Sequence, residues 1–227
     1  YPNLDIICWM KRYKANDALI SNSGKSFMDL PSGSVIGTSS IRRRSQVLSL
    51  RKDLSIKLLR GNVDTRIQKL KDQEYDAIIL SLAGLTRLNL EYLVTEVLDF
   101  KLFLPAACQG VVGVQAHKNS EIKKVFSLIN DSQTQIECMA ERRVLKNINA
   151  NCNSPVSIYA NIIENEMVLT FEIFDHQGNK ILKKSLVDER KKYLNLSDKL
   201  SEIIITALGQ KKIDELDNLK NDFDYTP

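Results

Sequence analysis

Long apolar runs are absent from this sequence of 227 residues. Stretches such as 77–80 fall far short of the roughly 20 apolar residues that a membrane-spanning helix needs, so we expect no membrane association. Glycine and proline are also scarce, with nine and five residues, whereas 43% of the residues are hydrophobic. This composition excludes a disordered chain and is typical of a globular protein with one large domain or a few small ones.

Cysteine and histidine are scarce too, with four and two residues. No two cysteines have the spacing of a zinc motif, so we expect no metal site and reduced thiols in a cytosol-like compartment. Cys8 and Cys138 lie in apolar stretches and Cys108 among small residues, and all three are expected to be structural. Cys152 lies in a polar turn, where an accessible thiol could be a nucleophile, an attachment point or an ordinary surface cysteine.

Charge of one sign is not in large excess, because 32 basic residues face 28 acidic ones and the net charge is +4. No stretch interleaves basic with aromatic residues, so we expect no nucleic-acid partner. No signal peptide is visible, and the sequence begins Tyr1-Pro2 without an initiator methionine. We expect a cytoplasmic protein, or a plastid protein if a targeting segment precedes Tyr1.

The first half of the chain alternates strand-like with helical patterns. Strands are expected at 33–37, 54–59 and 76–82, and helices at 41–51, 64–70 and 85–90. This alternation is typical of βαβ units and a parallel sheet, in which ligands bind beyond the carboxyl ends of the strands.

The pattern changes around Pro105, where the small and apolar segment 104–113 suits a crossover or hinge. The remainder predicts a small α+β domain with a three-stranded antiparallel sheet. Its elements are expected to be a helix at 132–148, strands at 156–163, 167–174 and 181–187, and a helix at 197–208.

The segment GTSSIRRR, from Gly37 to Arg44, is the most informative stretch. A strand that leads through Thr38, Ser39 and Ser40 into a helix presents hydroxyls and unpaired amides at the positive end of the helix dipole. Arginines just inside the helix add forked donors that match carboxylates. The alternative is a serine-capped helix with solvated arginines.

Arginines also follow the other two expected strands. Arg60 precedes Gly61 at the end of the second strand, Arg66 begins the next helix, and Arg87 follows the third strand. In a parallel sheet these residues and the 37–44 segment would gather at one edge and bind a small molecule with several carboxylates. The alternative is that long cationic side chains merely coat an α/β surface.

Several motifs occur in one order along nearly the whole chain. They are GTSSIRR at 37–43, LRGNVDTR at 59–66, YDAIIL at 75–80, AGLTRL at 83–88, LP at 104–105, QG at 109–110, AER at 140–142, and NC at 151–152 with Pro155. Together they resemble the porphobilinogen deaminase family, also called hydroxymethylbilane synthases, of tetrapyrrole and heme biosynthesis.

The resemblance implies a transferase that joins four porphobilinogen units, with release of ammonia, into the linear tetrapyrrole hydroxymethylbilane. It implies that the product grows on a dipyrromethane cofactor, held by a thioether to the loop cysteine, here Cys152. Each pyrrole carries an acetate and a propionate, so the growing chain needs many cationic partners. The implied cofactor- and substrate-binding residues are Thr38, Ser39, Ser40, Arg42, Arg43, Arg60, Gly61, Arg66, Arg87 and Gln109.

The resemblance also implies two α/β lobes like those of periplasmic binding proteins, with a C-terminal α+β domain that carries the cofactor cysteine. The expected parts are 1–15 with 105–131 as hinges and a remnant of the first lobe, 16–104 as the second lobe, and 132–227 as the C-terminal domain. The family's catalytic aspartate belongs to a Lys-Asp motif upstream of Tyr1. We therefore expect no catalytic residue in this chain, an incomplete first lobe and a fragment inactive alone, from an enzyme that is a monomer at full length.

Two positions depart from the family pattern, because Cys108 and Asn151 stand where glycine is usual. The competing interpretation is a non-enzymatic two-lobed module that binds a carboxylate or phosphate reversibly. Such a module would be indifferent to Cys152.

Overall fold

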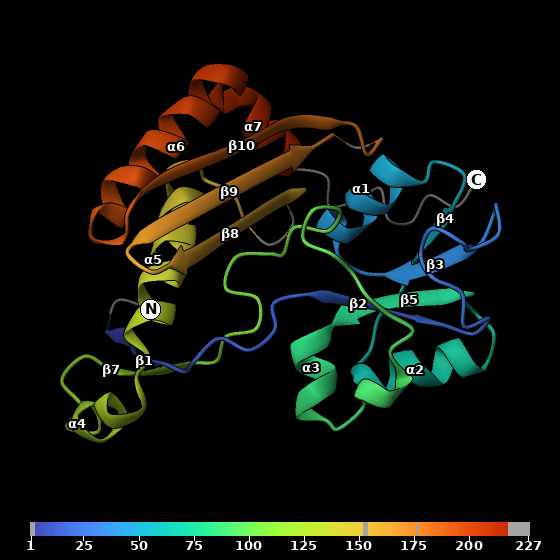
Figure 1. Cartoon of the computed structure of the whole chain (residues 1–227), viewed down its shortest axis with the longest axis horizontal. Helices are drawn as coiled ribbons and strands as arrows, with labels where there is room; N and C mark the ends of the chain where they lie inside the picture. The colour runs from blue at the N-terminus through green and yellow to red at the C-terminus, as the bar shows by residue number, and fades with distance from the viewer. Residues whose placement is uncertain (1–2, 152–153, 176, 218–227) are drawn as a thin grey trace.

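Three sheets organise the chain in a computed structural model that describes residues 3–151, 154–175 and 177–217 (Figure 1). The first sheet has five strands in the order β4-β3-β5-β2-β6. Its strands are β2 (Asp17–Ser21), β3 (Val35–Thr38), β4 (Ser55–Leu58), β5 (Ala77–Ser81) and β6 (Glu96–Val97).

The three strands expected from the sequence, β3, β4 and β5, are parallel to one another. The parallel pairing predicted for these strands is confirmed, and two further strands extend the sheet: β2 pairs antiparallel with β5, and β6 pairs antiparallel with β2. Sequence analysis missed β2. The chain enters it from the extended segment 10–16 and not through a helical crossover, so β2 belongs to no βαβ unit.

Helices cover both faces of this sheet (Figure 1). They are α1 (Ile41–Leu50), α2 (Val63–Lys71) and α3 (Leu82–Arg87), with a 3-10 turn, η1, at Glu91–Leu93. Ile79 of β5 packs with Val47 of α1, whereas its neighbour Ile78 packs with Ile67 of α2 on the opposite face. Alternation along buried strands therefore builds two cores and a three-layer α/β unit.

Side chains cap both longer helices of this unit. The Ser40 side chain accepts from Arg43 N at the start of α1. The cap of α2 is Asn62, because Asn62 Oδ1 accepts from both the amide and the hydroxyl of Thr65.

A two-stranded antiparallel sheet forms from β1 (Leu4–Trp9) and β7 (Gly113–His117). It is followed by α4 (Lys123–Phe126) and a 3-10 turn, η2, at Ser127–Ile129. The connections 10–16 and 98–112 run between this sheet and the five-stranded one. They are bonded to each other, with Met10 N donating to Val112 O at 3.0 Å and Tyr13 N to Gly110 O at 2.9 Å.

The remaining elements form the expected α+β unit, and its three-stranded antiparallel sheet is confirmed. They are α5 (Ser132–Asn147), β8 (Val156–Ile163), β9 (Glu166–Phe174), β10 (Lys180–Glu189), the 3-10 turn η3 (Arg190–Lys192), α6 (Tyr193–Leu208) and α7 (Gln210–Asp217). Phe171 and Leu169 of β9 pack with Val144 of α5 and Leu200 of α6 in one core. The domain boundaries expected from the sequence stay a prediction.

Among the described residues, no helix combines the length and the apolar character that a bilayer-spanning segment needs.

Gly110 lies where the two connections touch, with φ +83°, and a Cβ there would lie 2.6 Å from Tyr13 O. Gly24 also has a positive φ of +69°, but a Cβ there would meet nothing within 4 Å. We expect Gly24→Ala to lower the free energy of unfolding by about 1 kcal/mol. Gly110→Ala should cost about 1–3 kcal/mol more because of the clash. Urea denaturation compares the two, and equal losses would contradict this close packing.

Candidate functional site at the edge of the parallel strands

The carboxyl ends of β3, β4 and β5 meet at one edge of the five-stranded sheet. The turn after β3 brings the residues of the TSS motif there. Thr38 is buried and its Oγ1 accepts from Ser40 N at 3.1 Å, whereas Ser39 is exposed. Thr38 therefore shapes the turn, and Ser39 offers the free hydroxyl. The first turn of α1 contains no acidic residue that would occupy its amides.

A buried carboxylate, Asp17, lies against the two arginines that open α1. Its Oδ2 accepts from Arg42 Nη1 at 2.8 Å, and its Oδ1 accepts from Arg43 Nη2 at 2.7 Å and Nε at 3.0 Å. Burial raises the pKa of Asp17, but the charges of Arg42 and Arg43 outweigh it and lower the pKa to about 2. Sequence analysis missed Asp17, although an aspartate at the head of an apolar run was the available signal.

Gln109 completes this arrangement, which we call the Asp17 cluster (Asp17, Arg42, Arg43 and Gln109). The Gln109 Oε1 accepts from Arg42 Nη2 at 3.2 Å. The Gln109 Nε2 donates to Asp17 Oδ1 at 2.9 Å and to Ala15 O at 2.6 Å. Arg42 also donates to Leu104 O at 3.0 Å, and only 5% of it is exposed. The structure thus brings three expected residues together around a carboxylate of the chain itself.

The other expected arginines have no acidic partner among the described residues. Arg60 and Arg87 are exposed, and Arg66 is half-buried, with its Nε donating to Gly61 O at 2.7 Å. Burial and the nearby charge of Arg43 both lower the pKa of Arg66. Arg66 therefore lies close enough to Arg43 for repulsion. Arg60 and Arg87 share this edge by topology, without a contact to the other expected residues that the structure describes.

Gly61 forms the turn between Arg60 and α2. Its φ is +125°, and a Cβ there would lie 2.8 Å from Thr65 Cγ2. The turn therefore requires glycine. Cys152, the expected attachment point, lies outside the described residues.

A second buried ion pair, between Arg12 and Glu141, lies beside the connections, and sequence analysis missed its basic member, Arg12. Arg12 Nη2 donates to both oxygens of Glu141, at 2.9 and 3.0 Å. Glu141 also accepts from Ala160 N at 2.8 Å and Cys108 N at 2.5 Å. Burial raises the pKa of Glu141, although Arg12 opposes that rise. Glu141 thereby joins α5, β8 and both connections.

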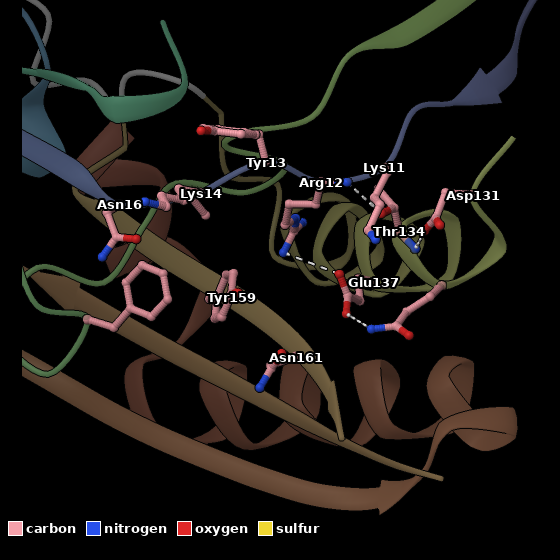
Figure 2. Close-up of a pocket in the computed structure, with 13 residues that line it drawn as sticks. Lys11, Arg12, Tyr13, Lys14, Asn16, Asp131, Thr134, Glu137, Tyr159 and Asn161 are labelled. Carbon is pink, nitrogen blue, oxygen red and sulfur yellow. Dashed lines mark hydrogen bonds and ion pairs between the residues drawn. The ribbon is translucent and has the colours of Figure 1, made fainter. Parts of the chain in front are cut away.

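A cavity of about 540 Å³ opens beside this pair (Figure 2). Lys11 and Lys14 line it together with Tyr159, whose ring centroid lies 5.1 Å from Arg12 Cζ.

Comparison with known proteins places the chain in a family. The model of the "Porphobilinogen deaminase, dipyromethane cofactor binding domain" matches residues 1–124, and that of the "Porphobilinogen deaminase, C-terminal domain" matches residues 135–206. The chain belongs to the porphobilinogen deaminase family.

Curated porphobilinogen deaminases are similar along most of the chain. That of Clostridium kluyveri is 39% identical over 203 residues, which cover 89% of this chain and 69% of the relative. That of Bacillus mycoides is 39% identical over 214 residues, with 90% and 69% covered. That of Campylobacter jejuni is 37% identical over 205 residues, with 89% and 66% covered.

Porphobilinogen deaminases are transferases, so the enzymatic interpretation is confirmed over the non-enzymatic module. The activity is that of a hydroxymethylbilane synthase, which condenses four porphobilinogen units with release of ammonia, and its cofactor is dipyrromethane.

Two substitutions test the ion pair between Arg12 and Glu141. Arg12→Met leaves the Glu141 carboxylate buried without its counter-charge, so we expect the free energy of unfolding to fall by about 3–5 kcal/mol. Arg143→Met is the control, because the Arg143–Asp198 pair is exposed and its loss should cost about 0–1 kcal/mol. Urea denaturation measures both, and similar losses would show that the buried pair contributes no more than a surface pair.

The Asp17 cluster predicts a loss of stability in acid. The pKa of Asp17 is about 2 in the folded chain and 3.8 for the free group, so the unfolded state binds more protons between these values. Its contribution is complete above about pH 5. About 1 kcal/mol should be lost by pH 3 and about 2 kcal/mol by pH 2. The Asp17→Asn variant, less stable throughout, should lack this component when unfolding is measured against pH.

Asp53→Asn is the matched control for the acid dependence. Hydrogen bonding from Arg51 lowers the pKa of Asp53 to about 2 as well, but this carboxylate is exposed and solvent screens the pair. The Asp53→Asn variant should therefore follow the wild-type profile. If the wild-type protein instead showed the same dependence of unfolding free energy on pH as Asp17→Asn, the Asp17 cluster would not be the source of the acid sensitivity.

Proposed function

We propose that the edge at the ends of β3, β4 and β5 holds the carboxylates of dipyrromethane and of the growing pyrrole chain. The observation that carries this proposal is the placement of cations without counter-charges. Arg66 lies close enough to Arg43 to be disfavoured by its charge, and Arg60 and Arg87 have no acidic partner among the described residues. Such an edge is stabilised by an anionic ligand with several charges.

The donors at this edge fit dipyrromethane, whose two pyrrole rings carry an acetate and a propionate each. Arg60, Arg66 and Arg87 can each bind a carboxylate through two parallel N–H groups. The exposed hydroxyl of Ser39 and the amides that follow Ser40 in α1 add neutral donors. The cofactor supplies the primer to which porphobilinogen units are added.

The remaining expected residues act by positioning these donors. Arg42 and Gln109 are occupied within the Asp17 cluster, and Arg43 adds its charge to the edge while its N–H groups bind Asp17 and Ile79 O. Thr38 shapes the turn before α1. Gly61 does the same before α2.

We infer that Cys152 carries the cofactor through a thioether. Its neighbour Asn151 is exposed, and Asn151 N donates to Ser154 Oγ at 2.8 Å, which is typical of a tight polar turn. The sequence around Cys152 is polar, as expected for a thiol that accepts a bulky group.

The mass of the purified full-length enzyme tests the attachment. The intact protein should be heavier than its sequence by a two-pyrrole adduct and should give colour with Ehrlich's reagent, which reacts with pyrroles. Cys152→Ser should lose both signals, whereas Cys8→Ser, a substitution at a buried thiol, should keep them. An active enzyme without the adduct would disprove the attachment.

Substitution at the edge tests the carboxylate contacts. In the full-length enzyme, Arg60→Ala and Arg66→Ala should each weaken porphobilinogen turnover, measured as kcat/KM, about 10- to 100-fold, because one charge-assisted hydrogen bond contributes about 1.5–3 kcal/mol. Unfolding free energies should change by less than about 0.5 kcal/mol for the exposed Arg60. Arg190→Ala, at an exposed arginine of η3, is the control and should leave turnover unchanged. Normal turnover with a large loss of stability would contradict this role.

We further propose that the enzyme acts as a monomer in the cytoplasm without a nucleic-acid partner. The small net charge of +4 and the scattered cysteines support this. Sedimentation of the purified enzyme at working concentration tests the oligomeric state, and a stable dimer would overturn it.

A further inference from the structure

Cys108 and Cys138 lie side by side although they are 30 positions apart in the sequence. Their sulfur atoms are within 4.8 Å of each other, and Cys108 Sγ donates to Cys138 O at 3.9 Å. Cys108 lies on the connection that follows Pro105, and Cys138 lies on α5. All three described cysteines, these two and Cys8, are free thiols.

The backbone of Cys108 is held against α5. Cys108 N donates to Glu141 Oε2 at 2.5 Å, and Glu141 follows Cys138 by three positions on the same helical face. The φ of Cys108 is +58°, a left-handed conformation that a non-glycine residue keeps only when its surroundings impose it. The proximity of the two sulfurs is therefore built into the fold.

A cation lies beside the inner sulfur. Arg12 Nη2 is 3.4 Å from Cys138 Sγ, and Cys138 is completely buried. Hydrogen bonding from Cys108, and then the charge of Arg12, lower the pKa of Cys138 against the effect of burial. Hydrogen bonding to Cys138 and burial raise the pKa of Cys108. The inner sulfur is thus the better thiolate.

The outer sulfur is the accessible one. Cys108 is partly exposed and lines a cavity of about 550 Å³ together with Trp9, Val111 and Arg142. A small oxidant can reach Cys108 through this cavity, whereas Cys138 is shielded behind it.

Two thiols and the carboxylate of Glu141 could also suggest a metal site. The guanidinium of Arg12 argues against it, because it already lies among these donors, bonded to both oxygens of Glu141 and to Cys138 Sγ. A divalent cation would have to displace a buried arginine.

We propose that Cys108 and Cys138 are an oxidisable pair that closes to a disulfide when a small hydroperoxide enters the cavity. Cys108 sulfur passes its proton to the Cys138 thiolate and attacks a peroxide oxygen; the O–O bond breaks, the leaving hydroxide takes a proton from solvent to become water, and Cys108 becomes a sulfenic acid. Cys138 sulfur then attacks Cys108 sulfur; the S–O bond breaks, and the leaving oxygen takes the Cys138 proton and departs as water. Two electrons pass from the two thiols to hydrogen peroxide, and two water molecules form.

The disulfide would fix the connection that carries Gln109. Gln109 is the neighbour of Cys108 and binds Asp17, so oxidation would tie the Asp17 cluster covalently to α5. The oxidation state of the two cysteines would therefore affect how freely the connection 98–112 moves between the α/β unit and the α+β unit.

Peptide mapping tests the pair, because trypsin places each cysteine in a different peptide. The purified protein is reduced, treated with hydrogen peroxide, blocked with N-ethylmaleimide and digested. Before blocking, we expect the intact mass to fall by two hydrogen atoms; after digestion, we expect peptides 102–118 and 125–142 to be joined. Dithiothreitol should restore both thiols.

Three variants control this experiment. Cys108→Gly, which suits the positive φ, and Cys138→Ala should abolish the cross-link, whereas Cys8→Ala should keep it. Sulfinic acid at Cys108 without a cross-link, or pairing of either cysteine with a different partner, would overturn the proposal. So would thiols that resist peroxide until a chelator removes a bound zinc ion, which would show a metal site instead.

Discussion

A carboxylate with no exposure to solvent holds the candidate site together. Asp17 binds Arg42 and Arg43 at the start of α1 and also accepts from Gln109. Burying three charges without this pairing would cost several kcal/mol, so the arrangement is all-or-none. It fixes the N-terminus of α1 against β2, and it thereby fixes the edge where the parallel strands end.

The connection after Pro105 is held at two successive residues by two different clusters. Cys108 N binds Glu141, which pairs with Arg12 and belongs to the α+β unit. Gln109 binds the Asp17 cluster, which belongs to the α/β unit. A movement of this connection therefore changes the hydrogen bonds of both units at once.

Positive charges lie near one another at the edge of the sheet. Burial and the nearby charge of Arg43 both lower the pKa of Arg66, so its charged form is disfavoured in the fold. The chain thus concentrates positive charge at this edge, which supports the proposal that a ligand with several carboxylates binds there. Arg42 lies nearby but differs from Arg60, Arg66 and Arg87, because it has an acidic partner. Its charge is already compensated inside the fold.

The sequence by itself determined the family, the three parallel strands and the antiparallel meander, because these follow from local periodicity and from motifs of consecutive residues. Tertiary structure alone decided that β2 is antiparallel, that Asp17 and Arg12 carry the two buried ion pairs, and that Cys108 faces Cys138. Each of these depends on segments distant in the sequence that meet only when both units pack. A lone charged residue or cysteine has no local pattern that names its partner.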